Sequence, residues 1–395
     1  MAKPFRVLTL NNIAKIGLQR LPAGQYEVGG KIGDPDAILV RSQDMHAMEI
    51  AANVKAIARA GAGTNNIPVK QMSARGAPVF NAPGANANAV KELVITGMLL
   101  AARNLVPAIR FVDGLSGDDE SLHKLVEDGK KHFAGVELPN RTLGVIGLGK
   151  VGSLVADAAI KLGMNVLGYD PHITVDAAWS LPAQVKKANS VEEVLKAADF
   201  VTLHVPLLDA TRNLISAERL NLCKDGVILL NFARDGIVNI DAVLAGLAGR
   251  KVGSYVCDFP AQKLIGKAGV VALPHLGAST GEAEDNCAIM VVDQLREYLE
   301  HGNIQNAVNF PDVSMSRESP FRVGIANSNV PNMLGQISTA MADAGLNIHN
   351  MVNKSKGEMA YTLVDVDSAV SDAVVARISA IKGVLAVRNL PLERS

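Results

Sequence analysis

Short apolar runs alternate with helical stretches over the first ninety residues of the chain. The runs are separated by Gly, Pro or Asn and are predicted to be strands: Phe5–Leu10, Ala37–Val40, Val54–Ala58 and Pro78–Asn81. Strands that alternate with helices form βαβ units around a parallel sheet. The pattern therefore predicts an α/β domain over residues 1–90.

A second series of βα units begins at Thr142. Its predicted strands are Leu143–Ile146, Asn165–Tyr169, Phe200–His204, Val227–Asn231 and Val252–Cys257, with helical stretches such as Ser153–Leu162 and Val191–Ala197 between them. Two longer helices are predicted at Asn88–Asn104 and Gly281–His301. The first is apolar on more than one face, so we expect it to be buried between domains or subunits.

The pattern changes at Asn303–Pro320, where Asn, Pro, Ser and Arg replace the periodic apolar residues. Residues 311–320 are therefore predicted to be a linker. The last segment follows the order strand, helix, strand, strand, helix, strand, over Phe321–Ala326, Met333–Ala344, Asn347–Val352, Met359–Val366, Ser368–Ile381 and Val384–Asn389. This βαββαβ order predicts a self-contained α+β domain over residues 321–395.

The composition narrows the function classes. The chain has 395 residues, which fits two or three domains, and it carries 39 Lys and Arg against 39 Asp and Glu. A chain without a basic surplus is not expected to bind nucleic acid or an anionic membrane surface. The longest apolar run, Leu93–Ala102, is about half of the ~20 residues that span a bilayer, so no membrane span is predicted.

The first residues and the cysteines favour a cytoplasmic protein. The segment MAKPFRVLTL contains no long apolar core followed by a cleavage site. Cys223, Cys257 and Cys287 lie far apart and form no metal-ligand pair. A sparse, odd set of cysteines fits a reducing compartment. We expect a soluble cytoplasmic enzyme without a metal site.

The sharpest chemical signal is a glycine-rich turn between a predicted strand and a predicted helix, in the sequence LGVIGLGKVG at positions 143–152. In dinucleotide-binding units the three glycines, here Gly147, Gly149 and Gly152, permit a tight turn, close approach of the backbone to a pyrophosphate, and close packing of helix on strand. The helix N-terminus then offers free N–H groups to the phosphates. The alternative is a structural glycine turn without a ligand.

Asp170 ends the next predicted strand and strengthens the nucleotide interpretation. An acid at this place accepts hydrogen bonds from the ribose hydroxyls and repels a ribose phosphate. No arginine follows it directly. The sequence therefore favours NAD over NADP, with a solvated Asp170 as the alternative.

Three further segments resemble the D-2-hydroxyacid dehydrogenase family. The segment NFARDGIVN at 231–239 resembles the family's arginine-bearing strand end. The segment LPHLGAST at 273–280 is similar to its histidine loop, in the form used by the members that oxidise phosphoglycerate. The segment GNIQNAVNFP at 302–311 is similar to the exit from the catalytic core, and the tail resembles an ACT regulatory domain. The resemblance covers essentially the whole chain.

The resemblance implies a fold and an activity. The implied fold is α/β, with a Rossmann NAD-binding domain (91–282) inserted in a flavodoxin-like substrate domain (1–90 and 283–310), plus the ACT-like α+β domain (321–395). The implied activity is NAD-dependent oxidation of 3-phospho-D-glycerate to 3-phosphooxypyruvate, the first step of L-serine biosynthesis, in a homodimer or homotetramer. Two alternatives stay open: a family member that acts on lactate, glycerate or formate, and an NAD-sensing corepressor that binds peptides.

Oxidation of a secondary alcohol needs a base for the hydroxyl proton and a cation for the carboxylate. His275 is the candidate base, since an imidazole titrates near working pH. Arg234 is the candidate anchor, since its planar fork of donors suits carboxylate and alcohol oxygens. The alternatives are a capped loop histidine and a surface ion pair of Arg234 with Asp235 or Asp258.

The resemblance also assigns the remaining NAD contacts and places Asp258 near the nicotinamide amide. The full predicted NAD set is Gly147, Gly149, Lys150, Val151, Gly152, Asp170, His204, Val205, Pro206, Ala233, Asp258, His275 and Gly277. For Asp258 the alternative is a plain acid at a strand end.

The chain departs from the family at one important position. Lys263 stands where relatives have the glutamate that holds the catalytic histidine. A lysine cannot supply a carboxylate. Either Glu282 or Glu284 on the following helix replaces it, or His275 works without a charged partner.

The first domain is predicted to hold the substrate. By resemblance, the substrate loops contain Arg41, Ser42, Arg59, Gly61, Ala62, Gly63 and Asn86, and Arg234 joins them. Arg41 is expected to bind the phosphate, and the N–H groups of Gly61, Ala62 and Gly63 are expected to form a nest for the carboxylate. The alternatives are an exposed Arg41 at a strand end and an Arg59 that braces the domains.

In the tail, Asn327, Asn329 and Asn347 match the serine-binding edge of ACT domains in this enzyme group. They imply L-serine as an effector. Some relatives have a histidine where this chain has Asn327. The alternative is that these asparagines are turn and helix-cap residues.

Overall fold

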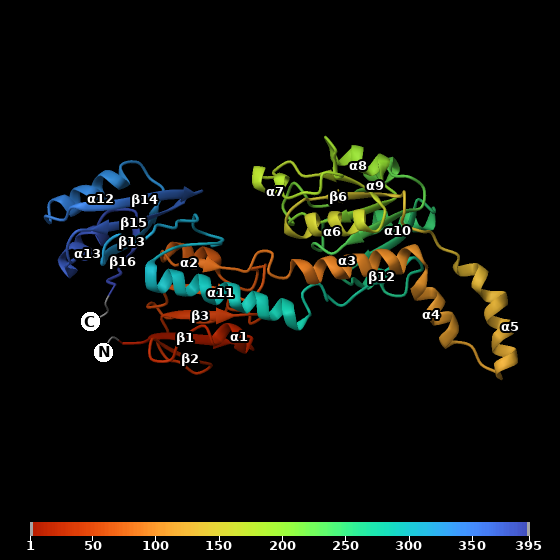
Figure 1. Ribbon diagram of the computed structural model, residues 1–395, viewed down its shortest axis with the longest axis horizontal. Helices are drawn as coiled ribbons and strands as arrows, with labels where there is room; N and C mark the ends of the chain where they lie inside the picture. The colour runs from red at the N-terminus through yellow and green to blue at the C-terminus, as the bar shows by residue number, and fades with distance from the viewer. Residues whose placement is uncertain (1–2, 393–395) are drawn as a thin grey trace. The chain divides into compact units, whose positions relative to one another are not determined.

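The computed structural model describes residues 3–392, apart from the side chain of Asp176, and divides into two compact units (Figure 1). Unit 1 consists of Met1–Asn86 and Gly281–Ser395, and unit 2 consists of Ala87–Thr280. The chain therefore leaves unit 1 after its first sheet and returns to it with a long helix. The expected domain boundaries lay at 90/91 and 282/283, within a few residues of these crossings.

Unit 1 begins with a parallel five-stranded sheet in the order β2-β1-β3-β4-β5. Its strands are β1 (Phe5–Leu10), β2 (Tyr26–Gly29), β3 (Ala37–Val40), β4 (Ala56–Arg59) and β5 (Val79–Phe80). Strand β3 is buried at all four positions, as expected for a parallel strand that helices cover on both faces. The strand order is the flavodoxin-like order, so this prediction is confirmed.

Helix α11 (Gly281–His301) covers one face of this sheet, and its buried residues join the strands in one core. Helix α1 (Lys15–Leu18) packs tightly on it, because a Cβ atom at Gly17 would lie 2.7 Å from the Cβ of Ala288. Helix α2 (Val69–Ala74) contributes Met72 to a second core with β3, β4 and β5. The sheet is thus an apolar layer enclosed by helices.

Unit 2 contains a parallel seven-stranded sheet in the order β12-β11-β10-β9-β6-β7-β8. The strands are β6 (Thr142–Ile146), β7 (Asn165–Tyr169), β8 (Lys186–Lys187), β9 (Phe200–Leu203), β10 (Val227–Asn231), β11 (Val252–Cys257) and β12 (Val270–Ala272). The helices of this unit include α3 (Ala87–Ala102), α6 (Lys150–Lys161), α7 (Val175–Trp179), α8 (Val191–Ala197), α9 (Ala217–Leu222) and α10 (Ile240–Ala248). The strand order reverses between β6 and β9, which is where dinucleotides bind in Rossmann folds.

Two helices project from unit 2 as an arm, α4 (Leu105–Asp113) and α5 (Asp119–Gly129), with the short η1 (Lys130–Phe133) after them (Figure 1). Phe111 of α4 packs against the ring of Phe133 with centroids 5.2 Å apart. None of the residues of α4 is buried. Among the described residues no single helix has the length and apolar character to cross a bilayer; the pair α3 and α4, bent by 67°, meets those two criteria together.

The tail of unit 1 is a four-stranded antiparallel sheet in the order β14-β15-β13-β16. Its elements are β13 (Phe321–Ser328), α12 (Met333–Ala342), β14 (Ile348–Lys356), β15 (Met359–Val366), α13 (Asp372–Ser379) and β16 (Val384–Asn389). The two helices share one apolar core with the sheet. The βαββαβ prediction is confirmed.

The tail packs directly on the rest of unit 1 through a buried arginine. Arg322 is fully buried, and its Nε and Nη2 lie 2.6 and 2.9 Å from the carboxylate oxygens of Asp365. Its Nη1 also donates to the carbonyl oxygens of His301 (3.2 Å) and Met315 (3.0 Å). Tyr361 Oη donates to the carbonyl oxygen of Gly302 at 2.9 Å. The tail is thus bound to the end of α11.

The segment 311–320 is consequently not a free tether, and the expectation of a linker is corrected. Val313 and Met315 are buried in the same core as α11, and Ile304 forms a β-bridge with Val313. Two isolated apolar side chains give no periodic signal in a sequence. Their burial depends on contacts with residues far away in the chain.

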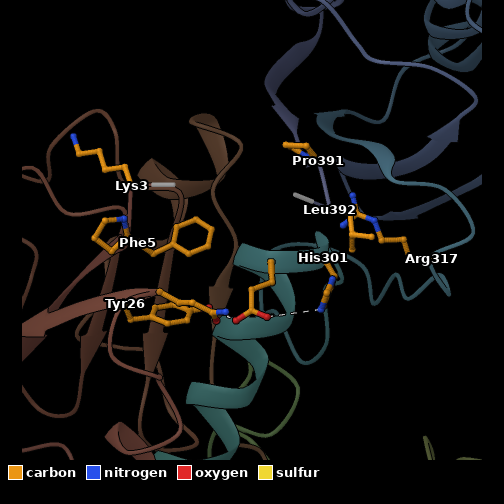
Figure 2. Close-up of a pocket in the computed structure, with 11 residues that line it drawn as sticks. Lys3, Phe5, Tyr26, His301, Arg317, Pro391 and Leu392 are labelled. Carbon is orange, nitrogen blue, oxygen red and sulfur yellow. Dashed lines mark hydrogen bonds and ion pairs between the residues drawn. The ribbon is translucent and has the colours of Figure 1, made fainter. Parts of the chain in front are cut away.

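A cavity of about 270 Å³ lies at this junction (Figure 2). Phe5 and Tyr26 line one side of it, and His301, Arg317 and Leu392 line the other. Tyr26 Oη donates to Glu300 at 2.5 Å, and Arg317 donates to the carbonyl oxygens of Ser319, Pro320 and Leu390. No residue that the sequence assigned to a site lines this cavity.

Candidate active site

The glycine-rich turn of unit 2 has the geometry that a dinucleotide requires. Gly147 has φ +94°, and a Cβ atom there would lie 2.7 Å from the His204 backbone. At Gly152 a Cβ atom would lie 2.0 Å from the carbonyl oxygen of Gly147. At Gly149, the N-cap of α6, a Cβ atom would meet nothing within 4 Å. The first and third glycines thus shape the turn, and the second leaves open space before the helix N-terminus, where a pyrophosphate binds.

Asp170 lies beside this turn, just after β7. One carboxylate oxygen accepts from the N–H of Leu148 and the other from the N–H of His172, each at 2.9 Å. These bonds fix the carboxylate at the edge of the glycine turn. The geometry therefore fits the role predicted for Asp170 toward the ribose hydroxyls.

His204 follows β9, opposite the glycine turn. Its Nε2 lies 2.9 Å from the Oγ1 of the buried Thr202. The ring is half-buried by the surrounding chain, and desolvation lowers the pKa of His204 to about 3. The imidazole is thus neutral in the working range. Val205 and Pro206 continue this loop, as predicted for a wall of the NAD site.

The candidate catalytic residues extend from the ends of strands in unit 2. Arg234 lies in an exposed turn directly after β10, and His275 lies in an exposed loop shortly after β12. Both strand ends belong to the carboxyl edge of the parallel sheet, the edge at which ligands bind in such folds. His275 has φ +58°, an uncommon backbone conformation for a residue other than glycine.

The imidazole of His275 has an aromatic neighbour that sequence reasoning missed. The ring of Phe259 meets it edge-on with centroids 5.0 Å apart. Lys263 turns elsewhere, since its Nζ pairs with the carboxylate of Asp241 at 2.6 and 2.9 Å. The sequence does show an aromatic residue, Phe259, directly after Asp258. Nothing in the sequence, however, indicates that Phe259 contacts the loop of His275, sixteen residues later.

The predicted substrate loops of unit 1 come together at the ends of β3 and β4. Arg59 braces them, because its Nε donates to the carbonyl oxygen of Arg41 (3.0 Å) and its Nη1 to that of Gly63 (2.6 Å). A Cβ atom at Gly61 would lie 2.7 Å from that Nη1. Arg59 is thus a brace within unit 1, in addition to any contact with a substrate.

Arg41 itself is paired with Glu284 of α11, at 2.5 Å between Nη2 and Oε1. Both side chains are about one-third to two-fifths exposed, so the pair is accessible to solvent and to a ligand. Ser42 is exposed beside it and donates its N–H to Asn11 at 3.3 Å. Of the two acids proposed to replace the missing glutamate, Glu284 therefore already has a cationic partner.

Two asparagines lie in or beside the predicted substrate loops of unit 1. Asn86 lies half-buried in the turn 83–86 that ends unit 1. Asn81, which sequence reasoning did not single out, donates to the carbonyl oxygen of Ala62 at 2.5 Å. Its position directly after β5 was a signal that the sequence offered.

In the tail, Asn327 and Asn329 line one pocket of about 190 Å³. Asn327 is 1 % exposed, and its Oδ1 has no hydrogen-bond partner among the described residues. Asn347 does not line this pocket within one chain; it lies directly before β14, where its N–H donates to Asp367 at 3.2 Å. The three predicted effector residues are therefore not brought together in a single subunit.

Comparison with known proteins identifies the family. The model of the D-isomer specific 2-hydroxyacid dehydrogenase NAD binding domain matches residues 96–277. The D-3-phosphoglycerate dehydrogenase of Haemophilus influenzae is 32% identical over 340 residues, which cover 83% of this chain and 79% of that protein. The chain belongs to the D-isomer specific 2-hydroxyacid dehydrogenases. It is an NAD-dependent dehydrogenase of this family.

Two further proteins show how much of this chain, and of their own chains, the similarity covers. The D-3-phosphoglycerate dehydrogenase of Methanocaldococcus jannaschii is 33% identical over 344 residues, 85% of this chain but only 62% of that protein. The crystal structure of the TT0316 protein from Thermus thermophilus superposes with a TM-score of 0.63 at 27% identity, covering 77% of this chain and all of that one. The family's common fold thus accounts for most of this chain.

The residues of unit 2 fit NAD. The open space at Gly149 and the N-terminus of α6 suit the pyrophosphate, and the fixed carboxylate of Asp170 suits the adenine ribose. When bound, NAD supplies the hydride acceptor of the family's reaction. His275 and Arg234 are the candidates of this chain for the base and the carboxylate anchor.

Proposed function

We propose that this dehydrogenase oxidises 3-phospho-D-glycerate to 3-phosphooxypyruvate with NAD, the first step of L-serine biosynthesis. The observation that carries the proposal is that Arg234 and His275 both follow strands at the carboxyl edge of one sheet of an NAD-binding unit, together with relatives that bear the phosphoglycerate dehydrogenase name. A corepressor that only senses NAD has no use for both groups.

The residues divide the chemistry between them. Arg234 holds the substrate carboxylate through its guanidinium fork. Neutral His275 accepts the hydroxyl proton as the C2–H bond breaks and its hydride leaves, so that the alcohol becomes a ketone and the imidazole an imidazolium. The ring of Phe259 contacts that imidazole edge-on.

Arg41 is proposed as the ligand of the substrate phosphate. A hydroxy acid without a phosphate does not need this arginine for binding. Its present partner Glu284 forms an accessible pair, and such pairs contribute only about 0–1 kcal/mol. A phosphate dianion can therefore displace the carboxylate. The backbone N–H groups of Ala62 and Gly63 are proposed to bind the substrate carboxylate, whereas the N–H of Gly61 donates to the carbonyl oxygen of Arg59 at 2.8 Å. Ser42, Arg59 and Asn86 shape the loops.

The direct test is turnover with NAD on a panel of D-2-hydroxy acids: 3-phosphoglycerate, glycerate and lactate, with formate as the family's other substrate class. We expect 3-phosphoglycerate to give the highest kcat/KM. Replacing Arg41 by Ala should raise KM for 3-phosphoglycerate at least tenfold and leave glycerate unchanged. Preference for glycerate in the unaltered enzyme, or equal losses on both substrates, would assign a different substrate.

His275→Ala should lose the ~10²–10⁴-fold that a general acid–base provides. Calorimetry of NAD binding measures how much of the loss comes from the coenzyme contact that is also predicted for His275. Turnover close to that of the unaltered enzyme would remove His275 from the mechanism.

We further propose that the tail binds L-serine as an effector, that the enzyme is a homodimer or homotetramer, and that it is cytoplasmic. The pocket beside Asn327 and Asn329 supports an amino-acid ligand, because the orphan Oδ1 of Asn327 lacks a donor that an ammonium group supplies. Asn347 would complete that pocket only from a second copy of the tail. Helix α4, none of whose residues is buried, supports self-association.

A further inference from the structure

Two buried polar side chains end adjacent strands of unit 2. Asn231 is the last residue of β10, and Asp258 follows the last residue of β11; each is 1 % exposed. The strands are paired there, with Asn231 opposite Cys257, and the N–H of Asp258 donates to the carbonyl oxygen of Asn231 at 3.2 Å. Neither side chain continues the sheet. Each turns into the loop that carries one catalytic group.

Asn231 closes the turn that presents Arg234. Its Oδ1 accepts from the N–H of Ala233 at 3.2 Å, and its Nδ2 donates to the carbonyl oxygen of Arg234 at 3.0 Å. Both ends of the amide are therefore engaged in the same four-residue turn. Arg234 is exposed, and its own side chain bonds only to the neighbouring carbonyl of Ala233 in the described part of the chain.

Asp258 holds the loop that presents His275. Its Oδ1 accepts from the N–H of Leu276 and its Oδ2 from the N–H of Gly277, both at 2.7 Å. A Cβ atom at Gly277 would approach Oδ2 to 3.1 Å, so the glycine permits this contact. The two bonds fix the residues that directly follow His275, whose φ of +58° persists only where its surroundings impose it.

The chemistry of Asp258 favours a role toward this loop. Within the described residues the carboxylate forms no ion pair, and backbone N–H groups satisfy both of its oxygens. Burying a carboxylate without a cation is unfavourable, so its presence is not explained by stability. At 1 % exposure it offers little surface to a nicotinamide amide, and that predicted contact stays a prediction.

We propose that Asn231 and Asp258 are a pair of positioning residues, Asn231 for Arg234 and Asp258 for His275. The proposal rests on the catalytic roles given above to Arg234 and His275. Asp258 thereby does part of the work of the glutamate that Lys263 replaces: it sets the place of the imidazole through the backbone, and Phe259 contacts the ring.

The two substitutions should separate the kinetic constants. Asp258→Asn keeps the shape but replaces one acceptor by a donor that faces a backbone N–H. We expect kcat to fall about 10²-fold, the effect of a misplacement near 1 Å, while the Kd for NAD stays within threefold. Asn231→Ala should raise KM for the hydroxy acid, and the inhibition constant of oxalate, at least tenfold, since both depend on Arg234.

Ser254→Ala is the matched control. Ser254 lies on the same strand β11, is 9 % exposed, and donates through Oγ to the carbonyl oxygen of Gly269 at 3.0 Å, away from both catalytic loops. It loses a buried hydrogen bond of the same kind. We expect kcat and KM within twofold of the unaltered enzyme, with a similar drop in melting temperature.

Three outcomes would overturn the proposal. Equal kinetic losses in the control would mean that stability alone is affected. A rise in the Kd for NAD that matches the loss of kcat/KM in Asp258→Asn would make Asp258 a cofactor contact. If Asp258→Asn does not fold, Asp258→Glu replaces it in the test, since it retains two acceptor oxygens on a longer side chain. We expect this variant to fold and to have a lowered kcat. An unchanged kcat in Asp258→Glu would contradict the proposal. All assays use whichever hydroxy acid the unaltered enzyme oxidises, so failure on 3-phosphoglycerate counts only against the proposed substrate.

Discussion

At the scale of single residues, the site depends on groups that hold other groups. Asp170 shows this on the nucleotide side, where two backbone N–H groups fix a carboxylate that faces the glycine turn. Arg59 shows it in unit 1, where one guanidinium joins two substrate loops. The sequence shows the ligand-binding residues more plainly than the residues that brace them.

Coenzyme choice should depend on Asp170. Replacing it by Ala removes the charge that repels a ribose 2′-phosphate and the acceptor for the ribose hydroxyls. We expect kcat/KM for NAD to fall at least tenfold and the ratio of NADP to NAD use to rise. Steady-state kinetics with both coenzymes measure this, and an unchanged ratio would show that Asp170 does not select the coenzyme.

A second prediction at the scale of residues concerns Lys263, which stands where relatives have a glutamate. Lys263→Glu, combined with Asp241→Asn to remove the repulsion from the former partner of Lys263, restores a carboxylate to the loop. A nearby carboxylate favours an imidazolium, so the acid limb of the pH–rate profile should move to higher pH. Asp241→Asn alone is the control. An acid limb that stays in place would mean that another group already fills the role.

At the scale of elements, the strands and helices that are most buried are the ones whose bounds the sequence predicts best. Strands β3 and β10 are buried at every position and have the predicted bounds, because such a parallel strand is a continuous apolar run between turns. Strands β1, β7 and β11 also have the predicted bounds. Helix α6 begins at Lys150 rather than Ser153, since the glycine turn passes directly into the helix. The catalytic loops were predicted from their resemblance to the family's segments. Arg234 follows the predicted strand β10, whereas His275 follows β12, a half-buried strand that was not predicted.

Several of the elements that were missed bury little within one chain, although the missed β2 (Tyr26–Gly29) buries Tyr26 in the core. The short β8 is exposed, and α4 and α5 lie outside the core, so their apolar residues give no interpretable pattern. Phe259 and Asn231 were missed for another reason. Their roles depend on contacts between loops, which no local pattern encodes.

The arm of unit 2 should be covered by a second copy. Ile109 and Val112 of α4 are each 56% exposed, which is unusual for two apolar residues on one helix. Ile109→Asp should shift the enzyme toward the 41.6 kDa monomer in light scattering. Ile265→Asp, at a residue 69% exposed elsewhere in unit 2, is the control. An unchanged mass would place the subunit contact elsewhere.

At the scale of the whole molecule, unit 1 depends on one buried ion pair. Burial alone would raise the pKa of Asp365, but the hydrogen bonds from Arg322 and from the N–H of Glu318 outweigh it and leave that pKa below its ordinary value. A lowered pKa contributes stability above the ordinary value near 3.8, and this contribution is lost as the pH falls through the folded-state value.

Arg322→Met should therefore destabilise unit 1 by about 3–5 kcal/mol at pH 7, because Asp365 is left buried and unpaired. The double variant with Asp365→Leu should recover most of that loss. Urea unfolding from pH 7 to pH 3 measures both effects. The stability of the unaltered enzyme should fall more steeply below pH 4 than that of the double variant; parallel curves would contradict the assignment of Asp365.

The division of unit 1 by unit 2 has a consequence for synthesis on the ribosome. The first sheet is complete once Asn86 has emerged, but α11, which buries its apolar face, is translated only after Thr280. At 5–20 residues per second that interval is roughly 10–40 s. The NAD-binding unit is contiguous in sequence and can fold during this interval. Over the same time, the apolar side chains of Leu39, Ala58 and Phe80 lack the helix that buries them. Chaperone demand should therefore concentrate on the nascent N-terminal sheet, and slowing elongation across Ala87–Thr280 should lower the soluble yield.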